Sequence, residues 1–403
     1  MGRGRSGASG GSMPPADTPA FGSHEMAALF GLDPDIVYFN HGGYGVTPAP
    51  VRVTQDVWRR QIEANPTAFF DREHFVSLVR VAANRVATWL GGGGEGWVFV
   101  ANATAGLNSV LRSLGLASGD EIVLTDHGYN AVLQAALYES SAPGARVVTA
   151  HLPWPDYSHD GAVEAIARAI TPRTKLVIVD HITSPTALIL PVARIAELCR
   201  AKNVPLAVDG AHAPGHLREL DVPALGADIY VGNLHKWAFV PRGCGVLWAS
   251  PSWRERLHPT VISHGYGQGY TAEFDWQGTH DPTPMLCVDA AFDFAERIGR
   301  ARLVAWNFGL IEHAVPSLCA ALEVNQATPA EARAMMATVA LPSRVPGTRD
   351  NALALKRRLR EQHGLEAQIV PFQDRAWVRI AAAPYLSADD FGRLGVALRK
   401  VLD

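Results

Sequence analysis

Two residues in the middle of the chain could together perform chemistry on an amino acid. Lys236 lies in the run Gly232-Asn233-Leu234-His235-Lys236-Trp237, and Asp209 ends the apolar run Leu206-Ala207-Val208. A lysine amine beside phosphate-sized polar donors can form a Schiff base with pyridoxal 5′-phosphate (PLP). An acid at the end of an apolar strand can pair with the protonated pyridine nitrogen of that cofactor. The two residues in this order predict a PLP site.

Three further segments carry side chains that could complete such a site. Ala103-Thr104-Ala105-Gly106 opens a predicted helix, and backbone N–H groups at a helix N-terminus bind phosphate. His127 and Tyr129 follow an apolar run, where a flat side chain could stack on the cofactor ring. Arg379 lies between apolar neighbours in Trp377-Val378-Arg379-Ile380, and an arginine so placed can bind a carboxylate bidentately.

Each of these residues also has an ordinary structural explanation. Lys236 could be a loop lysine, Asp209 could cap a turn, and Thr104 could be a simple helix N-cap. The aromatic-rich segment Tyr266–Trp276 could line a roomy substrate pocket or pack between two subunits, and both interpretations stay open. The functional interpretation therefore depends on the fold bringing the residues together.

Short apolar runs alternate with helix-like stretches through the middle of the chain. Strands are predicted over residues 97–100, 121–124, 146–150, 175–180, 206–209, 228–232 and 243–248. Helices are predicted over residues 105–114, 127–140, 161–170 and 192–202. This alternation predicts an α/β fold with a mostly parallel sheet flanked by helices. Ligands bind at the carboxyl ends of strands in such sheets, which is where Asp209 is expected.

The length of 403 residues fits one large domain and a smaller one. We expect residues 1–22, rich in Gly, Ser and Pro, to be a disordered tail or an expression remnant. Residues 23–45 are expected to form an N-terminal arm of the active site, and residues 46–290 a large PLP-binding domain. An amphipathic stretch from Met285 to Ala301 leads into a small α+β C-terminal domain over residues 291–403, with a strand at 376–380 and a helix at 388–402.

Composition argues against several other classes of protein. The formal net charge is −3 with no dense basic run, so nucleic-acid binding is not expected. No apolar run is long enough to cross a membrane, and we expect a cytoplasmic protein. Four scattered cysteines without a CxxC pair suggest reduced core residues and no metal site.

The glycine run Gly91–Gly94 disfavours a nicotinamide dehydrogenase. It precedes a predicted strand, whereas a dinucleotide-binding loop follows a strand.

Taken in order, the motifs resemble a known family. The matching segments are residues 38–45 (YFNHGGYG), 102–106 (NATAG), 180–186 (DHITSPT), 208–215 (VDGAHAPG) and 232–237 (GNLHKW). On these segments the chain resembles fold-type I PLP enzymes of the class V aminotransferase superfamily. The similarity is greatest to the isopenicillin N epimerase-like branch, which is related to cysteine S-conjugate C–S lyases.

The resemblance implies a role for each candidate residue. Lys236 would hold PLP and shuttle the Cα proton, with Tyr129 as a second acid or base. Around the cofactor ring, Asp209 would pair with the pyridine nitrogen, His127 would stack, and His212, Ser184 and Thr186 would lie near the ring hydroxyl. The phosphate ligands would be Thr104, Ala105, Asn233 and His235, together with Thr279 from the partner subunit of a homodimer. The substrate carboxylate would bind Arg379, with Asn40 and Gly43 nearby.

Departures from the family pattern narrow the expected reaction. Cysteine desulfurases of this superfamily carry a nucleophilic Cys shortly before the substrate-binding Arg, and residues 341–379 contain none. Asn233 replaces a small hydroxyl residue of many relatives, and the segment 381–385 after the strand arginine is also altered. With that competitor removed, the resemblance to this branch implies β-elimination from a bulky cysteine S-conjugate in specialised metabolism, such as antibiotic biosynthesis.

Four alternatives to the lyase stay open. Amino-acid epimerisation is the nearest, and transamination or decarboxylating deamination follow it. The alternative from another class is a non-catalytic scaffold with a PLP-enzyme fold. The intact Lys236 and Asp209 argue against that scaffold.

Overall fold

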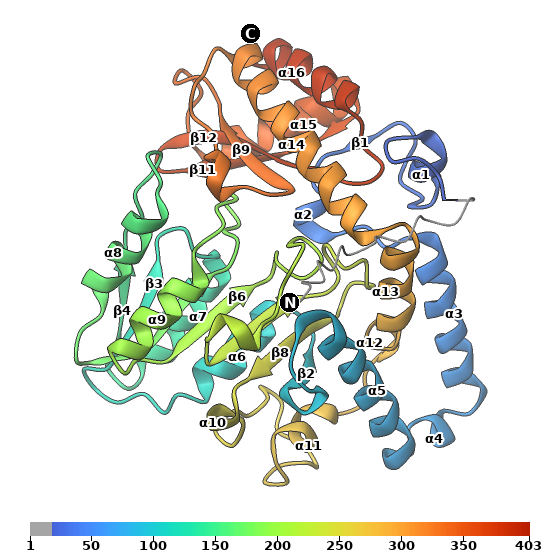
Figure 1. Cartoon of the computed structure of the whole chain (residues 1–403), viewed down its shortest axis with the longest axis vertical. Helices are drawn as coiled ribbons and strands as arrows, with labels where there is room; N and C mark the ends of the chain where they lie inside the picture. Colours follow the sequence, from blue (N-terminus) through green and yellow to red (C-terminus); the bar gives the residue numbers. More distant parts are fainter. Residues whose placement is uncertain (1–17) are drawn as a thin grey trace, which may run out of the picture.

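The computed structural model describes residues 18–403, and its largest element is a seven-stranded sheet (Figure 1). The strands are β2 (Trp97–Val100), β3 (Glu121–Thr125), β4 (Arg146–Ala150), β5 (Thr174–Asp180), β6 (Leu206–Gly210), β7 (Ile229–Asn233) and β8 (Gly245–Ala249). Their order is β2-β8-β7-β6-β5-β3-β4, and only β8 is antiparallel to its neighbours. The predicted α/β fold with a mostly parallel sheet is confirmed.

Helices cover both faces of this sheet because its strands are apolar on both sides. On one face lie α6 (Ala103–Arg112) and α7 (Asn130–Ser141), and on the other α5 (Arg72–Leu90), α8 (His159–Ala169) and α9 (Val192–Ala201). Ile178, Ala207 and Val231 are buried against the first pair. Because side chains alternate along a strand, Asp180, Asp209 and Asn233 point to that same face. Three polar side chains therefore lie at the carboxyl ends of β5, β6 and β7, beside α6 and α7.

The predicted elements of this region agree with the observed ones to within three residues. The stretch Met285–Ala301, however, is interrupted. Helices α12 (Thr283–Leu286) and α13 (Val288–Arg297) end before Gly299, whose φ of 85° lies in the left-handed region. Helix α14 (Arg300–Leu322) then starts in a new direction and packs on α16 (Ala388–Leu402).

The C-terminal part is built around a three-stranded antiparallel sheet in the order β11-β12-β9. Its strands are β9 (Met336–Ala340), β11 (Gln368–Phe372) and β12 (Arg375–Ala381). Helices α14 and α15 (Arg349–His363) pack against this sheet, and α16 packs on those two helices. Figure 1 shows this layer at the top, above the large sheet. The predicted strand at 376–380 and helix at 388–402 are therefore confirmed.

The N-terminal segment runs between the two sheets. After α1 (His24–Ala28), β1 (Val37–Tyr38) pairs in parallel with β10 (Leu365–Glu366), and α2 (His41–Tyr44), α3 (Ala49–Ala64) and α4 (Pro66–Phe69) follow. Gly45 has φ 65°, and a Cβ there would collide with the backbone oxygen of His235. Only glycine allows the segment to pass this close to the loop that carries Lys236.

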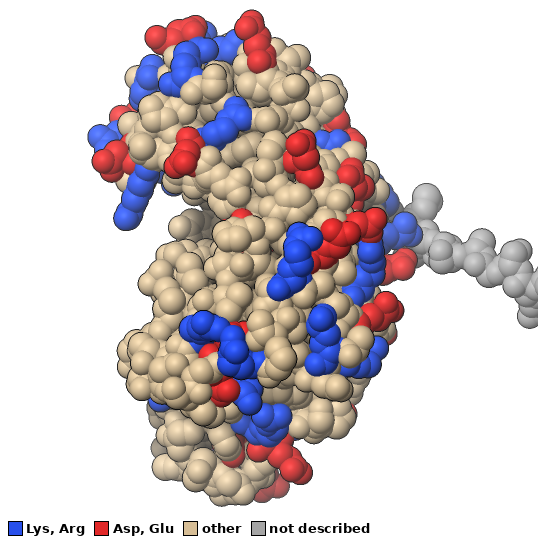
Figure 2. Space-filling view, turned by 90° about the vertical axis from the view of Figure 1, so that its left-hand side faces the viewer, with Lys and Arg blue, Asp and Glu red and all other residues tan. Residues whose placement is uncertain are grey.

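The remaining helices, α10 (Pro251–Arg254) and α11 (Tyr270–Asp275), extend below the large sheet (Figure 1). The predicted domain boundaries stay predictions, and residues 1–17 of the predicted tail lie outside the described residues. Within residues 18–403, no helix combines the length and the apolar character needed to cross a membrane. Figure 2 shows acidic and basic side chains intermixed on one face, and a notch below the C-terminal part.

Candidate active site

A cavity of about 440 Å³ lies where the large sheet, the N-terminal segment and the C-terminal sheet meet. It is lined by Lys236 and His212 from the large sheet, by Asn40 and Gly43 from the N-terminal segment, and by Arg379 from β12. Residues that are separated by more than three hundred positions in the sequence thus face one space. The carboxyl ends of the parallel strands form its floor, as expected for a ligand site in an α/β fold.

Lys236 lies three residues after the end of β7, in a loop that other segments hold in place. His41 Nε2 lies 3.0 Å from the backbone oxygen of Lys236, and the His41 ring packs on Trp237 with centroids 5.2 Å apart. The Lys236 Nζ lies 3.2 Å from His212 Nε2. Burial, and then the nearby charge of Arg379, lowers the pKa of Lys236 to about 7. An uncharged, nucleophilic amine is therefore accessible near neutral pH.

Asp209 is the penultimate residue of β6 and is buried. One carboxylate oxygen accepts a hydrogen bond of 2.9 Å from the backbone N–H of Ala211. Burial raises the pKa of this carboxyl. Asp180 is its partner on β5 in the parallel pairing, and it is buried as well. Asp180 was missed as a site residue, although it follows an apolar run just as Asp209 does.

The predicted phosphate-binding residues gather at the start of α6. Asn102 caps the helix, since its Oδ1 accepts a 2.9 Å hydrogen bond from the N–H of Ala105. Asn233 Oδ1 accepts a 2.8 Å hydrogen bond from the N–H of Ala103. Thr104 and Ala105 follow in the first turn, half-buried. Asn233 therefore ties the helix N-terminus to the end of β7, a role that its sequence position did not reveal.

His235 extends this group toward Lys236. Its Nδ1 lies 3.2 Å from the backbone oxygen of Cys244, at the turn before β8. Burial lowers the pKa of His235 to about 4, so the ring is neutral at physiological pH. Four residues predicted to hold a phosphate therefore lie along the sheet edge that also carries the lysine.

Arg379 is held by two other segments of the chain. Its Nη1 donates to the backbone oxygen of Ser184 at 2.6 Å and to the Ser184 Oγ at 3.0 Å. Its Nη2 donates to Asn40 Oδ1 at 3.2 Å. Burial lowers the pKa of Arg379 to about 10, which leaves the guanidinium charged at neutral pH. A fixed cation therefore faces the cavity and is suited to bind a carboxylate.

His127 lies beside the cavity wall rather than among its lining residues. It is fully buried, with Nδ1 2.7 Å from Thr186 Oγ1 and its ring 4.6 Å from that of Phe372. Burial lowers the pKa of His127 to about 4. Tyr129, two residues later, lines the cavity and is 48% exposed. Stacking by His127 therefore stays a prediction.

Two predicted features lie away from the Lys236 cavity. Thr279 is exposed in the loop after α11, so its predicted role through a partner subunit stays a prediction. In Tyr266–Trp276, Tyr270 donates a 3.1 Å hydrogen bond to the backbone oxygen of Leu247, and Phe274 packs in the core. Neither of these two rings lines the Lys236 cavity, and Tyr266 is exposed, so both interpretations of the segment stay open.

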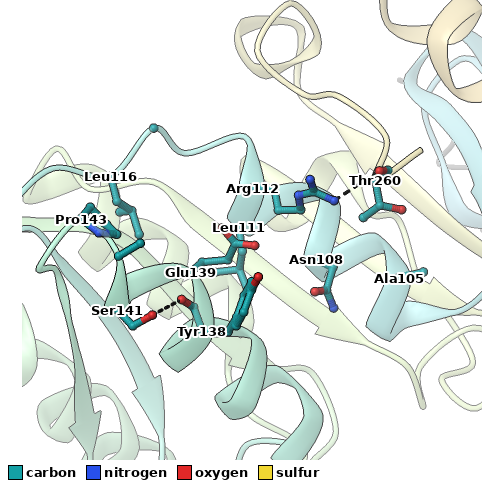
Figure 3. Close-up of a pocket in the computed structure, with 12 residues that line it drawn as sticks. Ala105, Asn108, Leu111, Arg112, Leu116, Tyr138, Glu139, Ser141, Pro143 and Thr260 are labelled. Atoms are coloured by element: carbon teal, nitrogen blue, oxygen red, sulfur yellow. Dashed lines mark hydrogen bonds between the residues drawn. The ribbon is translucent and has the colours of Figure 1, made fainter. Parts of the chain in front are cut away.

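A larger hollow of about 970 Å³ lies on the outer side of α6 and α7 (Figure 3). Arg112 crosses it, with Nη1 donating to the backbone oxygen of Thr260 at 3.3 Å, and Asn108 and the exposed Tyr138 lie along its wall. Ala105 lies at its edge. The hollow thus begins beside the predicted phosphate site but does not contain Lys236.

The residues of the Lys236 cavity fit PLP. An amine with a lowered pKa, a strand-end carboxyl and a capped helix N-terminus lie along one sheet edge. His212 Nδ1 is buried and has no hydrogen-bond partner within residues 18–403, so it can pair with a polar atom of a bound group. Among these same residues, no cysteine lines the cavity, and Cys199, Cys244 and Cys287 are buried in the core.

Comparison with known proteins places this geometry in a family. The aminotransferase class-V family model matches residues 47–386. The chain is 32% identical to isopenicillin N epimerase from Streptomyces clavuligerus, over 91% of this chain and 95% of that protein. It is 28% identical to L-cysteine desulfhydrase from Arabidopsis thaliana, over 91% of this chain and 88% of that protein.

Solved structures share the fold at lower sequence identity. A structure of C-DES with glycine covalently linked to its PLP cofactor has a TM-score of 0.78 at 21% identity, covering 92% of this chain and 98% of that one. A cysteine desulfurase from Thermococcus onnurineus has a TM-score of 0.76 at 19% identity, with coverage of 97% and 98%. The fold, the site chemistry and the family match agree: the chain belongs to the class-V aminotransferases and is a PLP-dependent enzyme.

Proposed function

We propose that the protein is a C–S lyase that cleaves an S-substituted cysteine by β-elimination, releasing a thiol, pyruvate and ammonia. The observation that carries the proposal is the single buried amine of Lys236, which faces the same cavity as the fixed guanidinium of Arg379. The similarity to an L-cysteine desulfhydrase supports this reaction class. So does the fold shared with C-DES, itself a cystine C–S lyase.

Several residues would hold the cofactor. Lys236 would bind it covalently, Asp209 would pair with its ring nitrogen, and His212 and Ser184 would face its ring hydroxyl. The α6 N-terminus, with Thr104, Ala105, Asn233 and His235, would bind its phosphate. Bound PLP supplies an electron sink that lowers the barrier to breaking bonds at the substrate Cα.

The chain itself would choose which bond breaks by orienting the substrate. Arg379 binds the carboxylate bidentately, and its own contacts to Ser184 and Asn40 fix the direction of the guanidinium. The Lys236 Nζ then takes the Cα proton as a base, since its pKa of about 7 matches the working pH. The same amine can return that proton to the departing sulfur.

Apolar residues in the cavity lining favour an uncharged, apolar substituent on sulfur. Val370, Pro371 and Phe372 of β11 and Leu133 of α7 form an apolar wall there. The cavity of about 440 Å³ must also hold the cofactor ring, so these apolar residues, and not the volume, support an apolar S-substituent. A large apolar S-substituent would bury its surface against these residues.

Epimerisation is the second candidate, because the Tyr129 hydroxyl lines the cavity and could serve as a second acid or base. An epimerase needs proton donors on both faces of Cα, and the 32% identity to isopenicillin N epimerase supports this alternative. The two candidates differ in whether a thiol leaves the substrate.

We infer that the enzyme works as a homodimer with active sites that share residues across the interface. Val261, Ile262 and Tyr266 expose apolar surface on one segment, and the exposed Thr279 follows it. The hollow beside α6 (Figure 3) could receive such a segment from a second copy. Thr279 would then reach the phosphate of the neighbouring site.

Incubation of the PLP-loaded enzyme with a series of S-alkyl and S-aryl cysteines tests the proposed reaction. We expect thiol and pyruvate in equal amounts, with a lower KM for the larger substituents. A keto acid that retains the sulfur would indicate transamination, and CO₂ release would indicate decarboxylating deamination. Either of these as the main product would refute the lyase proposal.

A further inference from the structure

Asp180 and Asp209 form a pair of buried carboxyls at the carboxyl edge of the large sheet. Strands β5 and β6 are parallel neighbours, and their register sets Asp180 directly beside Asp209. Both side chains point to the α6/α7 face, because Ile178 and Ala207, two residues earlier on each strand, pack in the core on that face. Neighbouring strands lie roughly 4.8 Å apart, so the two carboxyls are adjacent.

The two carboxyls open into one small space. A cavity of about 230 Å³ is lined by both of them, and its other walls include Leu124, Val132 and Ile178. Asp180 is only 6% exposed and Asp209 only 4%. Apolar walls and burial make a second negative charge in this space costly.

The charged and titratable groups that face Asp180 do not neutralise it. They are Asp209 on β6, Asp126 and Tyr129 after β3, and Lys236 after β7. The Lys236 Nζ makes its polar contact with His212, and Asp126 accepts its hydrogen bond from the N–H of Leu152. No side chain within residues 18–403 donates a hydrogen bond to the Asp180 carboxyl.

The pKa shifts of the two carboxyls agree with these surroundings. Burial, followed by the neighbouring charge of Asp209, raises the pKa of Asp180 well above its usual value. Burial also raises the pKa of Asp209, but the N–H of Ala211 stabilises the Asp209 anion. Asp209 accepts the 2.9 Å bond from Ala211, whereas Asp180 has only its own backbone N–H, so the geometry favours Asp209 as the carboxyl that keeps the charge.

We propose that the two carboxyls share one proton, with Asp180 as the neutral partner that donates its O–H to Asp209. The pair then carries one negative charge, located on Asp209. Asp180 would act as a positioning residue that fixes the orientation of Asp209 and stabilises its charge. The consequence for catalysis rests on the proposed role of Asp209 toward PLP, whereas the shared proton concerns the chain alone.

The full-length protein tests the shared proton through the pH dependence of its stability. Because the folded state retains a proton on Asp180 that the unfolded chain releases above pH 4, stability falls as pH rises above that value. Asp180→Asn keeps the shape of the side chain and supplies an N–H donor to Asp209 in place of the O–H. Unlike Asp180, the amide has no proton to release between pH 4 and pH 8. We expect Asp180→Asn to raise Tm at pH 8 by about 2 °C or more, and to lose this advantage near pH 4.

Asp126→Asn is the matched control, because Asp126 lines the same cavity but already accepts hydrogen bonds. It should show no gain in Tm at pH 8. A fall in Tm at pH 8 for Asp180→Asn would identify Asp180 as an anion stabilised by Lys236, and would overturn the proposal.

Infrared spectroscopy gives a second test that does not depend on stability. Because burial also raises the pKa of Asp275 to about 7, at pH 7 we expect the carbonyl band of a protonated carboxylic acid that persists in Asp275→Asn and is lost in Asp180→Asn. Absence of that band would equally overturn the proposal. Both tests can be made without substrate and with or without PLP. A failure of the lyase assay would therefore leave their outcome unaffected.

Discussion

At the scale of single residues, the amine of Lys236 is prepared mainly by burial. Its pKa of about 7 leaves a large uncharged fraction at neutral pH, and its nearest polar contact is His212 Nε2 at 3.2 Å. A lysine in solvent would be almost entirely protonated at that pH. The surroundings therefore supply the nucleophile before any cofactor arrives.

The lowered pKa of Lys236 makes the uptake of PLP depend on pH. Below pH 7 the fraction of neutral amine falls about tenfold per unit, so the rate of covalent PLP binding by the apoenzyme should fall in proportion. Above pH 7 the rate should level off. Stopped-flow absorbance measures this profile, and a rate that keeps rising toward pH 10 would show an ordinary lysine.

Replacement of Lys236 tests its role as the base. Lys236→Ala should lower turnover by about 10³-fold or more and abolish the absorbance band that borohydride removes. Lys202→Ala, at the exposed end of α9, is the control and should behave as wild type. An unchanged absorbance band in Lys236→Ala would place the covalent link elsewhere.

Arg379→Lys separates charge from geometry at the carboxylate site. Lysine keeps the positive charge but loses the fork that Ser184 and Asn40 hold in place. Hydrogen bonds to charged groups contribute about 1.5–3 kcal/mol, so KM should rise about 10- to 100-fold. Steady-state kinetics give kcat and KM separately, and an unchanged KM would exclude Arg379 from substrate binding.

At the scale of elements, the site depends on how α6 sits on the sheet. Asn233 ties the first turn of α6 to the end of β7, and Gly106 lies against Val231 of the same strand. The sequence predicted both the helix and the strand, because each has a clear local pattern. It could not predict the contact between Asn233 and Ala103, which exists only once the two elements are adjacent.

Gly106→Ala should therefore damage the site through packing alone. A Cβ there would lie 2.5 Å from Val231 Cγ1, so α6 must shift, which costs about 1–3 kcal/mol of unfolding free energy. PLP affinity should fall as the helix N-terminus moves. Gly392→Ala in α16, where a Cβ meets open space, should instead gain about 0.5–1 kcal/mol. Denaturant titration compares the two, and equal effects would contradict this packing argument.

Strand register explains why Asp180 escaped sequence reasoning. Asp180 and Asp209 each end an apolar run, yet only the alignment of β5 with β6 makes them a pair. The pairing of β1 with β10 joins Val37 to Leu365 and carries no local signal either. Elements with strong periodicity could be predicted, whereas contacts between distant segments required the three-dimensional fold.

At the scale of the whole molecule, the active site is assembled from three parts of the chain. Asn40 comes from the N-terminal segment, Lys236 from the large sheet and Arg379 from the C-terminal sheet. The motifs shared with the family identified these three residues as site candidates from the sequence alone. The role of each one stays a prediction. The proposed dimer would add Thr279 as a fourth contribution.

Mixing two impaired variants tests the shared site. In a hybrid of Lys236→Ala and Thr279→Ala subunits, one of the two sites would combine an intact lysine with an intact threonine. We expect the mixture to exceed the activity of either variant alone, up to about a quarter of wild type if each subunit pairs at random. Sedimentation should show a dimer throughout, and a monomeric, fully active enzyme would contradict this arrangement.

The most direct test of the central claim is one incubation of the PLP-loaded enzyme with an S-substituted L-cysteine in D₂O, followed by mass spectrometry and chiral chromatography. Thiol release, deuterium at Cα and inversion of the remaining substrate are measured together. The proposed elimination predicts one thiol and one pyruvate for each substrate consumed. Recovered substrate that is inverted and deuterated at Cα, with no thiol, would contradict it.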